Sequence, residues 1–153
     1  MTYLTVDRDR LICAIMLKKA IWGRAEMPYN INQLANPDIV EVEFSGDISA
    51  DDLREVTTKC IDLQKETNTS RFLVQLHRSE VVASFFDVYD LADQQYQREG
   101  LNRTSRIAVV LPTTLSAQAA ADFYETVCVN RGWNAQVHPH RQSALDWLMI
   151  DNS

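Results

Sequence analysis

Histidines and aspartates are the side chains in this sequence best suited to metal or acid–base chemistry. His138 and His140 flank a proline, and His77 follows an apolar run. A zinc-type site needs three or four converging ligands, and no cysteine or carboxylate stands at a matching spacing from these histidines. Three aspartates recur at every third position: Asp87, Asp90 and Asp93. That spacing is typical of a solvated helix face, so we expect no metal site.

Motifs for nucleotide and covalent chemistry are also missing from the sequence. The four glycines are far apart, which excludes a glycine-rich phosphate loop. No Gly-x-Ser-x-Gly turn and no locally supported cysteine–histidine pair occurs. The formal net charge of -6 argues against nucleic-acid binding, because binding to phosphates requires a basic surface. We therefore expect a protein that has no cofactor and is not an enzyme.

A dense apolar cluster gives the clearest hint of a binding function. It consists of Val81, Val82, Phe85 and Phe86. Phe86 lies off the apolar stripe that the following helix is expected to bury, so part of the cluster has no evident place in a core. Two interpretations remain open: packing in the core, and the wall of a hydrophobic groove or partner surface.

Strands are predicted where apolar residues alternate with polar ones or run continuously. Val40, Val42 and Phe44 alternate with glutamates, which indicates a strand at 39–45 with one buried face. A short strand at 29–34 is expected to pair with it as a hairpin. Two apolar runs predict central strands covered on both faces, and a short strand follows near the end of the chain. Their ranges are 71–76, 106–111 and 134–138.

Four helices are predicted from apolar residues that recur every three or four positions. Their ranges are 49–66, 84–99, 116–131 and 142–149. Ser49 and Ser84 each precede an aspartate by three residues, the acidic form of a capping box, and are expected to begin helices. The order β-β-α-β-α-β-α-β-α implies an α/β domain with a mixed, mostly parallel sheet and an N-terminal β-hairpin.

We assign the folded domain to residues 27–150 and treat residues 1–26 as an extension. The apolar run at 11–17 is too short to span a membrane, and its flanks do not fit a signal peptide. Three interpretations of the extension stay open: a packing or dimerisation helix, a weak membrane-surface anchor, or a segment foreign to the natural protein, which would then start at Met27. The cysteines have no pairing pattern and are expected to be free thiols of a cytoplasmic protein: Cys13, Cys60 and Cys128.

Several stretches resemble the SpoIIAA-like group of the STAS (sulfate transporter and anti-sigma factor antagonist) superfamily. Between residues 27 and 148 they read MPYNI, IVEVEFSGDISADDL, RFLVQL, FFDVYDLADQ, RIAVVLP, DFYETVCVNRG and SALDWL. The resemblance implies a small α/β domain that serves as a regulatory or protein-interaction module. A homodimer is plausible for a domain of this size. Because the fold is related to the CRAL-TRIO type of lipid-binding domain, a small hydrophobic or lipid-like ligand is the alternative.

The resemblance also suggests a phosphorylation site. Anti-sigma antagonists of this superfamily are phosphorylated on a serine in an Asp-Ser-x-Gly-like motif, where a helix begins after the central strand. Ser84 matches that serine by position, but Ala83 replaces the aspartate and Phe85 or Phe86 replaces the glycine. The residue pattern itself supports another role for Ser84, that of a helix cap.

Overall fold

The computed structural model describes residues 28–34 and 38–150, so the extension at 1–26 and the alternative start at Met27 lie outside the described residues. The strands are β1 (Tyr29–Leu34), β2 (Ile39–Phe44), β3 (Gly46–Ile48), β4 (Arg71–Gln75), β5 (Ser79–Val81), β6 (Arg106–Val110) and β7 (Asn134–His138). The helices are α2 (Ala50–Thr67), α3 (Phe85–Asp90), η1 (Leu91–Gln95), α4 (Tyr96–Glu99), α5 (Leu115–Asn130) and α6 (Arg141–Leu148).

Five strands form one mixed sheet in the order β1-β2-β4-β6-β7. β1 runs antiparallel to β2, with Tyr29 opposite Phe44, and the other neighbouring pairs of this sheet are parallel. This topology confirms the α/β class, the mostly parallel sheet and the N-terminal hairpin that the sequence predicts.

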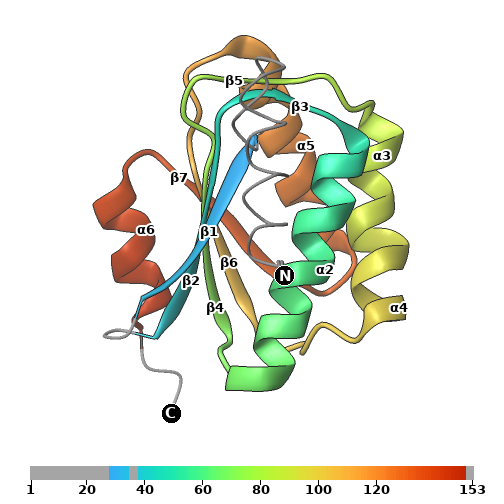
Figure 1. Cartoon of the computed structure of the whole chain (residues 1–153). Coiled ribbons are helices and arrows are strands. Elements are labelled where there is room, and N and C mark those ends of the chain that lie inside the picture. Colours follow the sequence, from blue (N-terminus) through green and yellow to red (C-terminus); the bar gives the residue numbers. More distant parts are fainter. Residues whose placement is uncertain (1–27, 35–37, 151–153) are drawn as a thin grey trace, which may run out of the picture.

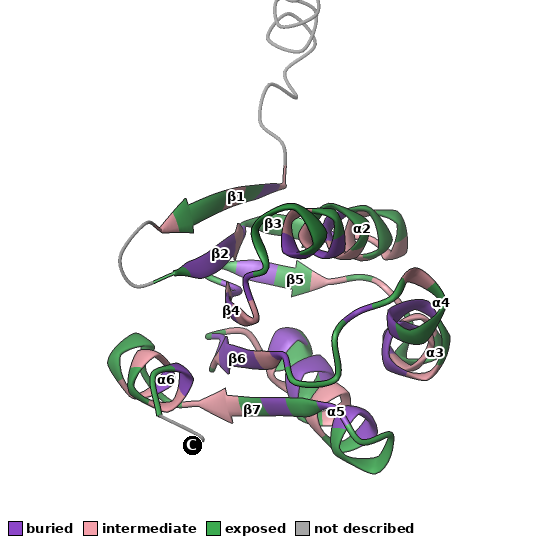
Figure 2. Cartoon of the chain, turned by 90° about the horizontal axis from the view of Figure 1, so that it is seen from below, coloured by how far each residue is buried: buried purple, intermediate pink, exposed green. Residues whose placement is uncertain are grey.

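Helices cover the two faces of the sheet unequally. α2, the α3–α4 segment and α5 lie on one face, and the shorter α6 lies on the other (Figures 1 and 2). Alternate residues of each strand serve the two faces: Val42 packs in the larger core, whereas Ile39 and Leu73 pack with Leu148 of α6. Within residues 28–34 and 38–150, no helix is long and apolar enough to cross a membrane.

A second, two-stranded sheet formed by β3 and β5 corrects the sequence prediction (Figure 1). The two strands are parallel, with Gly46 opposite Ser79. Gly46 has a φ of +76°, which a residue with a side chain rarely adopts, and this conformation lets the chain change direction after β2. Strands of three residues are too short to show an alternating pattern, so the sequence marks Gly46 only as a break.

The helix expected at 84–99 is interrupted by a wider, π-helical turn. In η1 the backbone N–H of Tyr96 donates to the carbonyl of Leu91, five residues back. Gln95 is 1% exposed, and its side-chain amide donates to the carbonyl of Arg54 in α2 at 3.0 Å. The π-helical turn therefore buries the polar side chain of Gln95 against α2. The spacing of apolar residues in this helix does not predict that burial.

Candidate functional site

An apolar cavity of about 130 Å³ lies between the sheet and the helices α2 to α5. Side chains from β2, β4 and β6 line it from the sheet: Val42, Phe44, Phe72, Val74, Ile107 and Val109. Side chains from the helices close it on the other side: Leu53, Val56, Val88, Leu91, Tyr96 and Tyr124. α5 contributes Ala120 and Ala121, whose small side chains leave space that larger residues would fill.

Val74 lines the cavity from the central strand of the sheet. Its strand, β4, has β2 on one side and β6 on the other. Leu73, the preceding residue, faces α6 and is 0% exposed. Val74 keeps an intermediate exposure in spite of its central position, because its side chain faces the cavity.

Two tyrosines bring hydroxyl groups into this apolar wall. Tyr96 of α4 and Tyr124 of α5 both line the cavity, and their hydroxyl oxygens lie 2.6 Å apart in a hydrogen bond. Trp133 packs edge-on against Tyr96, with the ring centroids 5.5 Å apart, and limits its movement. Burial raises the pKa of both phenols well above the ordinary value, so both are neutral at physiological pH.

Two cysteines lie in the same core. Cys60 lines the cavity, Cys128 is fully buried, and both are free, as the sequence predicts. Burial raises the pKa of each thiol to about 12, so neither supplies the thiolate that nucleophilic chemistry needs. The cavity therefore offers apolar contact and hydrogen bonding rather than a reactive sulfur.

The predicted apolar cluster faces two different environments. Val81, at the end of β5, lines the cavity. Val82, Phe85 and Phe86 are 60%, 52% and 70% exposed, and none of the three lines the cavity. Phe85 stacks on Phe123 of α5, with the ring centroids 4.8 Å apart. We refer to the three exposed side chains, Val82, Phe85 and Phe86, as the α3 surface.

Ser84 begins α3 and has the geometry that a capping box predicts. Its hydroxyl accepts a hydrogen bond from the backbone N–H of Asp87 at 3.1 Å and donates to the Asp87 carboxylate at 2.8 Å. Ser84 is exposed, and Arg54 of α2 lies 3.8 Å from the Asp87 carboxylate. The structure thus confirms the cap, with the hydroxyl at the surface.

The histidines are dispersed in the structure. His77 is exposed, with Nε2 3.4 Å from the carboxylate of Glu43. His138 packs against Trp147, with the ring centroids 5.5 Å apart, and burial lowers its pKa. His140 is exposed just before α6. In the part of the chain that the structure describes, no three His, Cys, Asp or Glu side chains are grouped so that they could hold a metal ion.

An ion pair on the α6 face is a feature that the sequence does not predict. Glu41 is 5% exposed, although the alternation in β2 suggests that it faces solvent. Arg141, at the start of α6, donates to the two carboxylate oxygens of Glu41 at 3.0 and 3.2 Å. Gln75 of β4 donates to the same carboxylate. Glu41 and Arg141 are 100 residues apart, so no local pattern reveals the pair.

The mixed sheet, the helices on both faces and the apolar cavity define an α/β domain. Residues 39–149 match the SpoIIAA-like family, and the chain belongs to this family. Its structure is similar to that of an uncharacterised protein with a SpoIIAA-like fold from Shewanella loihica. The two share 14% sequence identity with a TM-score of 0.51, over 78% of this chain and 91% of that chain. No curated protein matches the sequence.

These comparisons confirm the resemblance to the SpoIIAA-like group and the predicted fold class. They support a regulatory type of domain of the STAS kind. At 14% identity the structural likeness concerns the fold alone. The ligand and the partner must therefore be argued from this chain's own residues.

Proposed function

We propose that this chain is a non-enzymatic regulatory domain that acts by reversible binding, and that it takes a small apolar molecule into its cavity. The size and lining of the cavity carry this proposal. A protein cavity of about 150 Å³ lined by leucine, isoleucine and phenylalanine stays dry and binds benzene or xenon. The cavity of this domain, about 130 Å³, is of similar size, and most of its lining residues are leucine, isoleucine, phenylalanine or valine.

Dispersion contacts would supply much of the binding energy. Side chains that line an empty space lack neighbours on one side, and a ligand of matching shape restores those contacts. The volume suits a single small ring or a short branched chain better than the long tail of a membrane lipid. Among the hydrophobic or lipid-like ligands that the family resemblance suggests, the proposal therefore selects only the smallest molecules.

Benzene is a suitable probe for this proposal. Titration into the isotope-labelled full chain is expected to give saturable NMR shifts at residues around Val74 and Ala121. Ala121→Leu should fill the cavity from α5 and abolish these shifts. Ala119→Leu is the matched control, because Ala119 is exposed on the same helix. Ala120→Val offers a second filling variant if the leucine prevents folding.

Two results would contradict the cavity proposal. One is the absence of saturable shifts when benzene is added to the wild-type protein. The other is equal benzene affinity of the wild type and a folded Ala121→Leu or Ala120→Val variant.

The α3 surface supports a second candidate function, association with a protein, of which a second copy of this chain is the simplest case. Val82, Phe85 and Phe86 are each more than half exposed within five consecutive residues. Sedimentation velocity should then show a dimer that Phe86→Ser converts to a monomer. Met149→Ser is the control, because Met149 is an exposed apolar residue that follows α6 on the other face of the sheet. A wild type that stays monomeric at all concentrations would eliminate the homodimer.

Phosphorylation of Ser84 stays a prediction from the family resemblance. The exposed hydroxyl is accessible, but the Asp87 carboxylate, 2.8 Å away, would have to move from an added phosphate. Intact-mass measurement of the protein from its own host would detect a phosphate.

The same intact-mass measurement would decide between Met1 and Met27 as the natural start, and so whether residues 1–26 accompany the domain at 27–150. The cytoplasmic location is likewise a prediction.

A further inference from the structure

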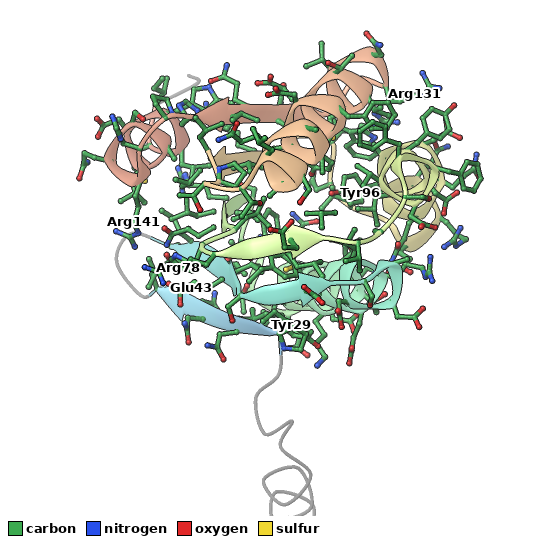
Figure 3. The ribbon with its side chains drawn as sticks, turned by 90° about the horizontal axis from the view of Figure 1, so that it is seen from above. Tyr29, Glu43, Arg78, Tyr96, Arg131 and Arg141 are labelled. Carbon is green, nitrogen blue, oxygen red and sulfur yellow. The ribbon has the colours of Figure 1, made fainter. Side chains whose placement is uncertain are left out.

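The hydrogen-bonded tyrosine pair places two hydroxyl groups together in the cavity wall, whose other hydroxyl belongs to Thr57. Tyr96 lies between the ribbons of α5 and the α3–α4 segment (Figure 3). Its hydroxyl oxygen is 2.6 Å from that of Tyr124, and both side chains line the cavity. The two hydroxyls carry two hydrogens, and the bond between them uses only one. One O–H group of the pair is therefore left to donate elsewhere.

The described residues provide no strong acceptor for this second hydrogen. The pair's mutual bond is the one hydrogen bond that either hydroxyl makes to an oxygen or nitrogen in the described part of the chain. The thiol of Cys128 lies close to Tyr124, and sulfur is a weak acceptor. A buried donor that lacks a good acceptor lowers stability. An acceptor placed inside the cavity would relieve this cost.

The remaining cavity wall limits the chemistry of that acceptor. The lining residues include no lysine, arginine or histidine that could neutralise an anion, and no aspartate or glutamate that could neutralise a cation. A charged ligand would lose its hydration without gaining a counter-charge. Burial raises the pKa of both tyrosines, so the pair stays protonated and acts as a donor. An uncharged acceptor, such as a ketone or ether oxygen, meets these conditions.

We propose that the cavity prefers small, uncharged, mainly apolar molecules that carry one hydrogen-bond acceptor, and that this acceptor binds the free hydroxyl hydrogen of the Tyr96–Tyr124 pair. This inference rests on the proposed function, since it names the ligand class of the same cavity. It assigns Tyr96 and Tyr124 as the residues that determine specificity, in a wall that otherwise selects by size and apolarity.

Cyclopentanone and cyclopentane form a matched pair of probes, which differ in one carbonyl oxygen. Their dissociation constants can be measured by NMR titration of the wild type and of the double variant Tyr96→Phe/Tyr124→Phe. The double variant is expected to weaken cyclopentanone binding about 2- to 10-fold, the range that one net hydrogen bond supplies. Cyclopentane affinity should change by less than about twofold, because it makes no hydrogen bond. Each single variant keeps one hydroxyl and should retain most of the affinity for cyclopentanone.

The outcomes separate this inference from the proposed function. If neither ring binds the wild type, the proposed function fails. If both rings bind but the double variant leaves the affinity for cyclopentanone unchanged, the tyrosine preference alone is overturned. If the double variant does not fold, intermolecular NOEs in the wild type decide instead. Cyclopentanone protons beside the carbonyl should contact the Tyr96 and Tyr124 rings, and contacts to Val42 or Phe72 in their place would overturn the inference.

Discussion

The Ser84–Asp87 pair at the start of α3 links a local sequence motif to the pH dependence of stability. The backbone N–H of Ser84 donates to the Asp87 carboxylate at 3.0 Å, and the Ser84 hydroxyl donates to the same oxygen at 2.8 Å. The backbone hydrogen bond, followed by the side-chain one, lowers the pKa of Asp87 from its ordinary value, because both bonds favour the charged carboxylate. The capping box is therefore strongest when Asp87 is ionised.

Ser84→Ala is expected to lower the free energy of unfolding by about 1 kcal/mol at neutral pH. A carboxyl group with a lower pKa in the folded protein stabilises the fold above its unfolded pKa, about 3.9 for aspartate. That contribution is lost as the pH falls through the folded pKa. The difference between wild type and variant should therefore be full at neutral pH and shrink below about pH 3.9.

Urea unfolding at a series of pH values measures this difference. The same Ser84→Ala change in an Asp87→Asn background, which removes the ionisable group, gives the reference for the loss of the serine cap alone. A Ser84→Ala difference that stays constant down to the lowest pH would show that the bond from the Ser84 hydroxyl does not favour the ionised Asp87, since the backbone N–H bond to Asp87 is kept in the variant.

α6 is held against the sheet by charged side chains at both of its ends. At its start, Arg141 pairs with Glu41 of β2. At its end, Arg71 donates to the carbonyl of Leu148 at 2.9 Å, and Arg106 donates to that of Trp147 at 2.8 Å. Positive charge is favourable beside the last carbonyls of a helix. A helix of eight residues is too short to be stable alone, so these contacts and its small core position it.

Arg141→Ala should release the first turn of α6 and leave the buried Glu41 carboxylate without its cation. Removing one partner of a fully buried pair costs 3–5 kcal/mol. Because the Arg141 side chain is 45% exposed, we expect a smaller loss, about 2 kcal/mol. Amide hydrogen exchange should become faster in α6 and stay unchanged in α2 and α5. Gln142→Ala, at the next position, removes only an exposed side-chain hydrogen bond to Asp146 within α6 and should speed exchange far less. Equal rates in the two variants would contradict a clamping role.

Local signals explain which elements the sequence can predict. Ser49 and Ser84 are correctly predicted to begin helices, because a capping box spans only four consecutive residues and can be recognised in the sequence. The same reasoning fails for β3 and β5, which are too short for a pattern and depend on pairing with each other. It also fails for the π-helical turn around Gln95, whose side chain contacts a backbone carbonyl 41 residues away.

At the scale of the whole molecule, the sequence predicts a sheet whose central strands are covered on both faces, but not the space inside one of the two cores. The apolar runs of β4 and β6 indicate cover on both faces, whereas the alternation in β2 wrongly places Glu41 toward solvent. The cavity depends instead on how Ala120 and Ala121 of α5 meet Val74 of β4, a relation between distant residues that no local pattern contains. For the same reason the cluster at 81–86 is recognised in the sequence, while its division into cavity-lining Val81 and the exposed α3 surface is not.

The two faces of the sheet should respond differently when the same residue type is truncated on each. Leu73 faces α6 and is 0% exposed, whereas Leu76, just after β4, lines the cavity. Leu73→Ala and Leu76→Ala are each expected to cost about 2–5 kcal/mol of unfolding free energy. Leu76→Ala adds its space to an existing cavity of about 130 Å³, so benzene should bind it and raise its melting temperature. Leu73→Ala keeps the wild-type cavity and opens a separate gap on the α6 face, so benzene should raise its melting temperature no more than it raises that of the wild type, and less than it raises that of Leu76→Ala. A calorimetric scan of both variants and the wild type, with and without benzene, measures the contrast. Equal stabilisation of the two variants would contradict a cavity confined to the face that α2, the α3–α4 segment and α5 cover.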